Sequence, residues 1–189
     1  MNQMNPTSNK KDFEDLTLNL KDLAYGYLEK YNPSKQQLKV YLLKKYLTKI
    51  KGTKSKKEVS VIIEDIVQNL EKNRLINDEI YSDSKARMYL RRGYSLNKIN
   101  QSLKNKGIEN EHIKKSIDKI KEDKIEPDFV SALKLCKRRR IGALRPGSNR
   151  ELFYKKDMGI LARNGFSFEL SKRILDLPLE EFNKLVRFI

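Results

Sequence analysis

Clusters of basic side chains are the groups in this sequence whose types and spacing could do chemistry. Four basic residues follow one another at 137–140, and the stretch 129–150 contains seven basic residues and no acidic one. Four consecutive cations exceed what a helix C-terminus needs, so we expect contact with a phosphate backbone or an acidic protein face. The candidate contact residues are Lys137, Arg138, Arg139, Arg140, Arg145, Arg87, Arg91 and Arg92.

Catalytic and metal-binding chemistry has few candidates. The chain has one histidine, His112, and one cysteine, Cys136, so a Cys/His zinc site cannot be built within one chain. The glycines occur singly instead of in a phosphate-binding loop. We expect His112 to be exposed on a helix and Cys136 to be a small buried hydrophobe. The sequence therefore predicts no catalytic, metal-binding or cofactor-binding residue, and no enzyme.

The charge of the whole chain points to a polyanionic partner. Its 189 residues include 41 basic and 25 acidic ones, for a net charge of +16. Nucleic acid, a nucleoprotein or an anionic membrane would suit that excess, although a Lys- and Asn-rich composition can also produce it as background. No run approaches the roughly 20 apolar residues that span a bilayer, and the N-terminus lacks an apolar signal core. We expect a cytoplasmic protein without internal disulfides.

The elements that carry the basic clusters are predicted to be helices. Leu, Ile and Lys dominate, whereas Gly and Pro number only eight and five. Asn77, followed by two acidic residues, predicts one helix start, and Ser95 predicts the next. Leu96, Ile99 and Leu103 recur at three- and four-residue spacing, which indicates a single apolar stripe. Because one stripe cannot stabilise a lone helix, we expect helices to pack in threes.

This pattern returns along the chain, which indicates one structural unit used three times. Ser34 and Gln37 form a capping box that corresponds to the start at Ser95. In the second and third units a helix ends in basic residues followed by Gly. The Gly fits a left-handed C-cap, and the basic residues suit the negative end of the helix dipole. The matching pairs are Ser34/Ser95, Leu38/Ile99 and Leu42/Leu103 at an offset of 61 residues, and Leu103/Leu161 and Gly107/Gly165 at 58.

The breaks between helices predict the organisation of the chain. Polar residues at the N-terminus indicate disorder, and a Lys-rich stretch in the first unit lacks apolar periodicity and reads as an exposed loop. The predicted segments are a disordered tail at 1–11, three-helix repeats at 12–76 (with the loop at 48–57), 77–126 and 127–177, and a short C-terminal helix at 178–189.

The order and spacing of these motifs resemble the RecX family of RecA regulatory proteins. The resemblance covers roughly residues 18–177 and is strongest in the middle repeat, where RMYLRRGYS at 87–95 precedes Ile99 and Leu103. The segment 74–79 is similar to that family's link between its first two repeats, and 161–167 is similar to its last repeat.

The resemblance implies an all-α fold, with three tandem three-helix repeats forming an elongated, curved molecule. It also implies a partner, because family members bind the RecA filament in its helical groove and modulate it, usually by inhibition. They suppress ATP hydrolysis and strand exchange in recombination and DNA repair, including the SOS response, and bind DNA weakly. They are not enzymes and have no cofactor, and we expect a monomer.

Several departures from the family pattern concern the outer repeats. Tyr46 stands where a Gly should end the second helix of the first repeat, which also carries the Lys-rich insertion. In the third repeat a long loop follows the first helix, and Ser171 replaces the apolar residue found at Ile113. The tail after Pro178 extends past the family's usual end.

Two other functions fit the same residues. The chain could be a general DNA- or RNA-binding helical protein that acts through its basic surface, or an assembly adaptor whose charge is background. Steep salt dependence and high affinity for naked DNA would favour the first, and absence of any DNA or filament binding would favour the second.

Overall fold

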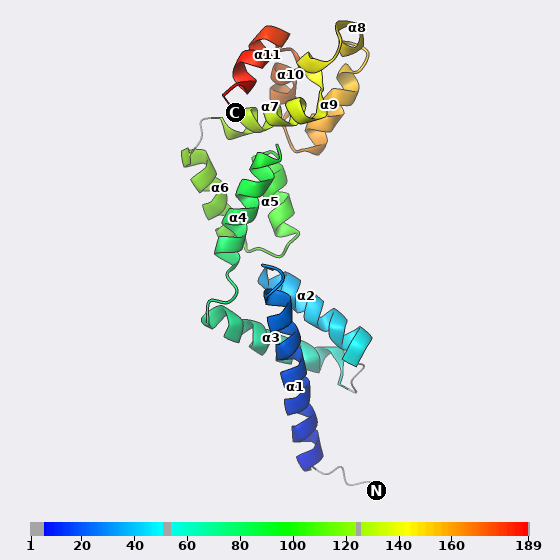
Figure 1. Ribbon diagram of the computed structural model, residues 1–189, viewed down its shortest axis with the longest axis vertical. Coiled ribbons are helices and arrows are strands. Elements are labelled where there is room, and N and C mark those ends of the chain that lie inside the picture. The colour runs from blue at the N-terminus through cyan, green and yellow to red at the C-terminus, as the bar shows by residue number, and fades with distance from the viewer. Residues whose placement is uncertain (1–5, 51–53, 124–125, 189) are drawn as a thin grey trace. The chain divides into compact units, whose positions relative to one another are not determined.

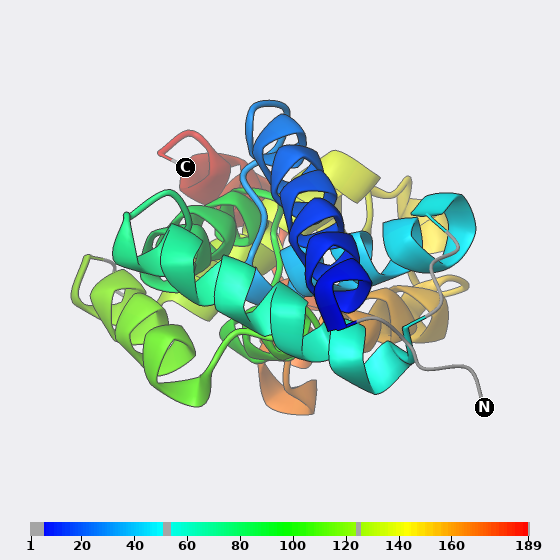
Figure 2. The same ribbon diagram turned by 90° about the horizontal axis from the view of Figure 1, so that it is seen from below.

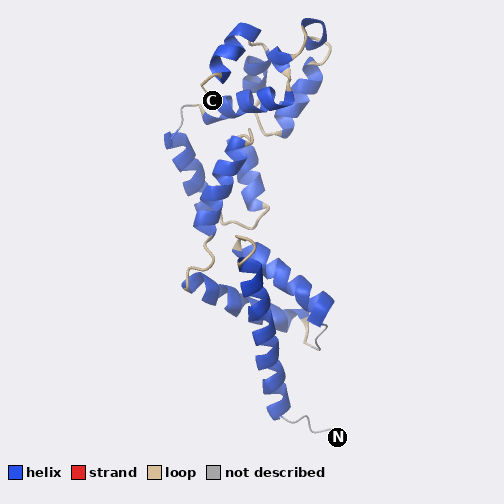
Figure 3. Ribbon diagram, in the orientation of Figure 1, coloured by secondary structure: helices blue, strands red, loops and turns tan. Residues whose placement is uncertain are grey.

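The computed structural model describes residues 6–50, 54–123 and 126–188. Within these ranges the chain forms helices joined by short turns, with no strand (Figure 3). The prediction of an all-α fold built from repeated three-helix units is confirmed. The elements are α1 (Pro6–Leu28), α2 (Lys35–Lys45), η1 (Tyr46–Ile50), α3 (Lys56–Lys72), α4 (Asp78–Arg91), α5 (Leu96–Lys104), α6 (Asn110–Asp123), α7 (Pro127–Arg139), η2 (Gly142–Leu144), α8 (Gly147–Arg150), α9 (Tyr154–Arg163), α10 (Phe168–Leu175) and α11 (Leu179–Val186).

The helices divide into two compact units, an N-terminal unit over residues 1–81 and a C-terminal unit over 82–189. In the N-terminal unit α1 crosses α3, and both contact α2 (Figures 1 and 2). The predicted capping box at the start of α2 is present, because Ser34 and Gln37 satisfy each other's backbone N–H groups. A second box, between Ser55 and Glu58, starts α3.

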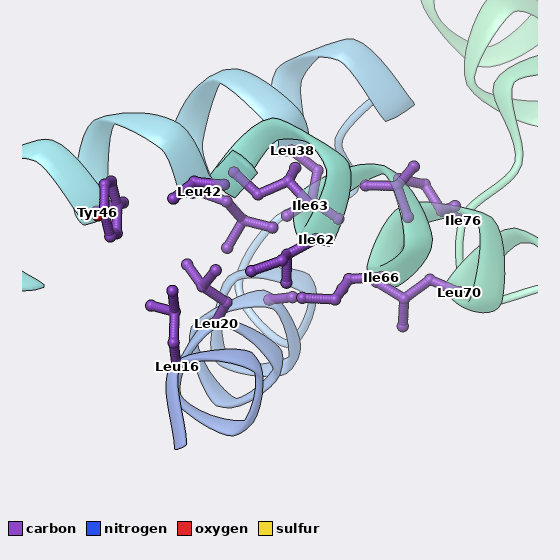
Figure 4. Packing of buried hydrophobic residues seen from close by; sticks show 13 residues of the cluster. Leu16, Leu20, Leu38, Leu42, Tyr46, Ile62, Ile63, Ile66, Leu70 and Ile76 are labelled. Atoms are coloured by element: carbon purple, nitrogen blue, oxygen red, sulfur yellow. The ribbon is translucent and has the colours of Figure 1, made fainter. Parts of the chain in front are cut away.

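The N-terminal core lies where the apolar stripes of these three helices meet (Figure 4). Leu20 of α1 and Leu38 and Leu42 of α2 are fully buried, and they pack with Ile62 and Ile66 of α3. Each such side chain contributes about 1.5–3 kcal/mol when removed from water. The three helices therefore depend on one another for stability, as single-striped helices must.

Two predicted boundaries of the N-terminal unit need correction. Helix α1 begins at Pro6, so the predicted disordered tail of 1–11 is wrong for 6–11, while 1–5 lie outside the described residues. The predicted loop of 48–57 is also too long, because η1 continues helical structure through Ile50 and α3 begins at Lys56. The Ser55–Glu58 box starts α3 before its first apolar residue, and residues 51–53 are not described.

The C-terminal unit begins within α4, which packs with α5 and α6. Asn77 Oδ1 accepts hydrogen bonds from the backbone N–H groups of Glu79 and Ile80, which confirms the predicted start of α4. Ser95 caps α5 as predicted. The residues buried between these helices include Ala86, Leu90, Ile99, Leu103, Ile113, Ile117 and Ile120.

The rest of the C-terminal unit is formed by α7, α9 and α10, with α11 covering α7. One cluster of buried residues runs through all four helices and includes Leu133, Leu161, Ile174 and Phe182. The predicted short helix after Pro178 is therefore present as α11, and its Phe182 is fully buried. Ser171 is buried as well, although it stands where the middle repeat has Ile113.

A close joint connects α4 and α5 to the helices that follow. The first N–H of α5, on Leu96, donates to Asp128 Oδ1 of α7 at 2.7 Å, and the N–H of Ser95 donates to the carbonyl of Asn164 at 3.2 Å. Gly93 lies against α7 at φ +73°, and a Cβ there would lie 2.9 Å from the Ser131 carbonyl oxygen and 3.0 Å from the Leu135 nitrogen. Only glycine fits that position without displacing α7.

We expect Gly93→Ala to destabilise the C-terminal unit by about 2 kcal/mol or more. A left-handed backbone costs a side-chain-bearing residue about 1–2 kcal/mol, and the contact with α7 adds to this cost. Urea unfolding of the full chain measures the loss. Gly147→Ala is the matched control, because open space surrounds Gly147, and an equal effect of the two substitutions would contradict the close joint.

Candidate polyanion-binding groove

The end of α4 presents the first set of cations. Its last turn closes in a Schellman arrangement, in which the N–H of Tyr94 donates to the carbonyl of Tyr89 and the N–H of Gly93 to that of Leu90. Arg91 and Arg92 occupy this turn with exposed side chains. They also suit the negative end of the helix dipole.

The second half of α7 presents the second set of cations. Lys134, Lys137 and Arg138 are spaced three and four residues apart, so they share one face of the helix. Because Gly93 rests on α7 near Ser131 and Leu135, the end of α4 lies beside this face. The two basic clusters predicted separately from the sequence are thereby brought together.

The two sets line one open groove of about 440 Å³. Its lining residues in the described part of the chain are Arg91, Arg92, Lys134, Lys137 and Arg138, so every one of them is basic. Lys137 Nζ also donates to the carbonyl of Val186 at the end of α11, at 3.4 Å. A concave surface lined by cations from two helix ends concentrates positive potential and suits phosphate or carboxylate groups.

Four of the eight predicted contact residues thus line the groove, and the others lie elsewhere. Arg139 and Arg140 are exposed at the end of α7, where Arg140 takes the left-handed position that Gly93 fills after α4. Arg87 Nη1 lies 3.1 Å from Asp123 Oδ2 and links α4 to α6. Sequence reasoning missed Lys134, although its helical spacing to Lys137 could have revealed it.

Arg145, another of the predicted contact residues, is half-buried and lies in an ion pair within the fold. Arg145 forms a two-pronged ion pair with Asp157, with Nε–Oδ2 and Nη2–Oδ1 distances of 2.6 Å. Asp157 is buried and also accepts the N–H of Gly142. The hydrogen bonds that Arg145 donates to Asp157 raise the pKa of Arg145. Arg145 therefore fixes the turn after α7, and its contact with DNA or the filament stays a prediction.

The two residues considered for catalysis have structural positions. Cys136 is buried as predicted, and burial, followed by the nearby Asp157, raises the pKa of its thiol to about 12. His112 is half-buried instead of exposed, because its backbone carbonyl accepts from Ser82 and Ser116 and draws α6 against α4. Across the described residues, no three His, Cys, Asp or Glu side chains gather in a way that could hold a metal ion.

None of the helices described is both long and apolar enough to cross a membrane. The tandem three-helix units and the cationic groove define a helical-repeat protein with a basic surface groove. Residues 77–117, which contain α4, α5 and most of α6, match the family model for the second three-helix domain of RecX.

Whole-chain comparisons extend this match. The regulatory protein RecX of Myxococcus xanthus is 34% identical over 160 residues, which cover 83% of this chain and 84% of that protein. The regulatory protein RecX of Corynebacterium efficiens is 30% identical over 131 residues, which cover 65% and 61% of the two chains. The chain therefore belongs to the RecX family of regulatory proteins.

Solved structures show the same fold at lower sequence identity. A crystal structure of regulatory protein RecX superimposes with a TM-score of 0.61 at 22% identity, over 93% of this chain and 80% of that one. RecX from Lactobacillus salivarius gives a TM-score of 0.58 at 18% identity, over 86% and 98% of the two chains.

The hydrogen bond between Leu96 and Asp128, beside the groove, should make the stability of the C-terminal unit depend on pH. Burial raises the pKa of Asp128 above its ordinary value of 3.8, and the hydrogen bond from Leu96 only partly opposes that shift. Protonated Asp128 therefore stabilises the fold at pH values below its ordinary pKa. This stabilisation is lost as the pH rises through the raised pKa of the folded state. Asp128→Asn keeps an acceptor for the Leu96 N–H but does not titrate. Urea unfolding between pH 3.5 and 7 should show the variant gaining stability relative to the wild type as the pH rises. A constant difference would contradict this assignment.

Truncation of Arg138, which lines the groove, and of Arg145, which pairs with Asp157, should change the unfolding free energy by different amounts. Arg145→Ala leaves the carboxylate of Asp157 buried without its ion-pair partner, so we expect a loss of about 2–4 kcal/mol in unfolding free energy. Arg138→Ala removes the same charge from an exposed site and should change stability by less than about 0.5 kcal/mol. Equal losses in thermal or urea unfolding would mean that Arg138 is structural too.

Proposed function

We propose that this protein binds RecA nucleoprotein filaments and inhibits their ATP hydrolysis and strand exchange, acting in recombination and DNA repair. Membership of the RecX regulatory family supports the regulatory role. The single observation that carries the proposal is the groove in which Arg91, Arg92, Lys134, Lys137 and Arg138 converge. Phosphates of the DNA and carboxylates of the filament protein are the groups that such a lining binds.

The repeated architecture suggests how binding would inhibit. A chain of several three-helix units can contact more than one protomer of a filament, and linked weak contacts raise the overall affinity through effective concentration. Once bound across protomers, the protein would restrict the rearrangements that accompany ATP turnover. A monomer in the cytoplasm suffices for this mode of action.

A second function, general nucleic-acid binding, is favoured by the wholly cationic lining of the same groove. The two proposals differ in partner and salt dependence. Filament regulation requires tighter binding to RecA on single-stranded DNA than to the DNA alone. Equal affinity for naked DNA, with a steep fall as salt rises, would replace the first proposal with the second.

The groove can be tested by a charge-matched pair of variants. Lys134→Ala/Arg138→Ala removes two cations that line the groove, and we expect at least about tenfold more protein to be needed for half-inhibition of RecA ATPase. Arg139→Ala/Lys172→Ala removes two exposed cations outside it and should leave inhibition within about twofold of the wild type.

Both variants should retain the helical circular-dichroism spectrum of the wild type, since all four substituted side chains lie at the surface or at its edge. If the two variants weaken inhibition equally, general charge and not the groove determines binding. If saturating, co-sedimenting wild-type protein leaves ATP hydrolysis unchanged, the inhibitory function itself is wrong.

A further inference from the structure

Helix α2 and the η1 turn that follows it have apolar side chains on two faces. Leu38, Leu42 and Tyr46 lie on the face that is buried in the core of the N-terminal unit. On the outer face, Val40, Leu43 and Leu47 recur at spacings of three and four residues, which place them in a second stripe. Val40 is 56% exposed and Leu47 is 54% exposed. Leu43, between them, is half-buried and also packs against the core of the N-terminal unit.

The outer stripe forms one wall of a groove, and α3 forms the other. The groove has a volume of about 170 Å³ and is lined by Gln36, Lys39, Val40, Leu43, Ser60, Ile63 and Glu64. That volume is close to the ~150 Å³ cavity that accommodates a benzene-sized group. Val61, 61% exposed on α3, adds apolar surface beside the groove. The groove therefore has room for an apolar side chain inserted from outside.

The second repeat has polar residues in place of Val40, Leu43 and Val61, and a buried Ile108 in place of Leu47. The N–H groups of Lys35 and Leu96 both donate to an Asp carboxylate of the next repeat, which fixes the 61-residue correspondence between α2 and α5. At this offset Val40 and Leu43 correspond to Gln101 and Lys104, which are exposed. Helices α3 and α6 can be aligned in the same way. The backbone N–H groups of Val59 and Ile113 each donate to the carbonyl of the residue just before their helix, so Val59 corresponds to Ile113 and Val61 to Lys115.

The outer face of α2 and α3 is thus apolar in one repeat and polar in the other, on the same backbone plan. Exposed apolar side chains such as Val40 and Val61 cost solubility, and the second repeat keeps its core with polar residues at both positions. A role in contact with another molecule accounts for the difference.

The charges around the groove indicate the chemistry of its occupant. Lys44 lies four residues after Val40, and Lys57 lies four residues before Val61, so both cations flank the apolar stripe and are exposed. The third lysine, Lys39, pairs with Glu64 across the groove at 2.6 Å. Lys44 and Lys57 therefore flank the apolar part of the lining, which Val40, Leu43 and Ile63 supply, and this arrangement complements carboxylates beside an apolar stripe.

We propose that the α2–α3 groove docks an amphipathic helix of a partner protein, with apolar side chains at i, i+4 and i+7 and acidic residues on both flanks. One apolar residue would enter the groove, the others would lie against the exposed Val40 and Val61 beside it, and the carboxylates would face Lys44 and Lys57. A protein helix fits better than nucleic acid, because the floor is apolar and the N-terminal unit holds only +4 of the chain's net +16, from 15 basic and 11 acidic residues.

Synthetic four-turn peptides test this proposal on the full-length chain. The first carries Leu at i, i+4 and i+7 with flanking Glu residues, and the second has the same composition in scrambled order. Both can bind the basic groove of the C-terminal unit through charge, but only the first can enter the α2–α3 groove. Fluorescence anisotropy should show at least tenfold tighter binding of the first peptide, and replacing its Glu residues by Lys should abolish that advantage.

Substitutions that copy the second repeat provide the decisive variant. Val40→Gln/Leu43→Lys installs residues that the repeat tolerates at the corresponding positions, so folding should be preserved. It should remove the tenfold preference for the ordered peptide even though it adds a positive charge. The matched control, Ile80→Gln/Leu152→Lys, makes the same changes at exposed apolar residues outside the groove and should retain the preference.

Three outcomes would overturn the proposal. Equal binding of ordered and scrambled peptides to the wild type would show that charge alone is recognised. An equal loss in the two variants would indicate non-specific apolar contact. Sedimentation that shows a wild-type dimer and a monomeric Val40→Gln/Leu43→Lys variant would assign the face to a second copy of the chain.

Discussion

The hydrogen bond from a helix's first N–H to a carboxylate of the next repeat is the interaction on which the arrangement depends. The first N–H groups of a helix have no partner inside it, and a buried helix start must find one elsewhere. The N–H of Lys35 donates to Asp78 Oδ1 at 2.9 Å, and the N–H of Leu96 donates to Asp128 Oδ1 at 2.7 Å. Each of these bonds lies within one compact unit, and the same backbone requirement accounts for both. The position of the basic groove depends on the second of these joints.

Local signals in the sequence predicted most of the fold. Ser34 and Ser95 cap their helices where the pattern placed them, since capping depends on residues a few positions apart. Long-range pairing could not be predicted in this way. Nothing within a helical turn of Arg145 indicates that Asp157 will bind it, so the ion pair of this half-buried cation could not be predicted. The sequence likewise could not predict that Arg91 and Lys137 line the same groove, because this depends on how α4 packs against α7.

The two units differ in the kind of surface they offer. The C-terminal unit has 26 basic and 14 acidic residues and carries most of the net charge, whereas the N-terminal unit is nearly balanced and exposes an apolar stripe on α2. Charge acts over nanometre distances and speeds encounter, while apolar contact acts only at close range and selects shape. A regulator with both surfaces can be attracted to a charged assembly and still distinguish among its parts.

The single buried cysteine makes the groove-bearing helix directly observable. Cys136 immediately precedes Lys137 on α7, and a thiol whose pKa is about 12 stays protonated and shielded in the native fold. Alkylating reagents can reach it only when α7 opens, so the labelling rate reports the opening equilibrium of that helix. Since the chain has no other thiol, one reagent follows this one helix in the unmodified protein. A bound polyanion that holds α7 closed would slow the labelling, and the native sequence thereby carries its own probe of occupancy.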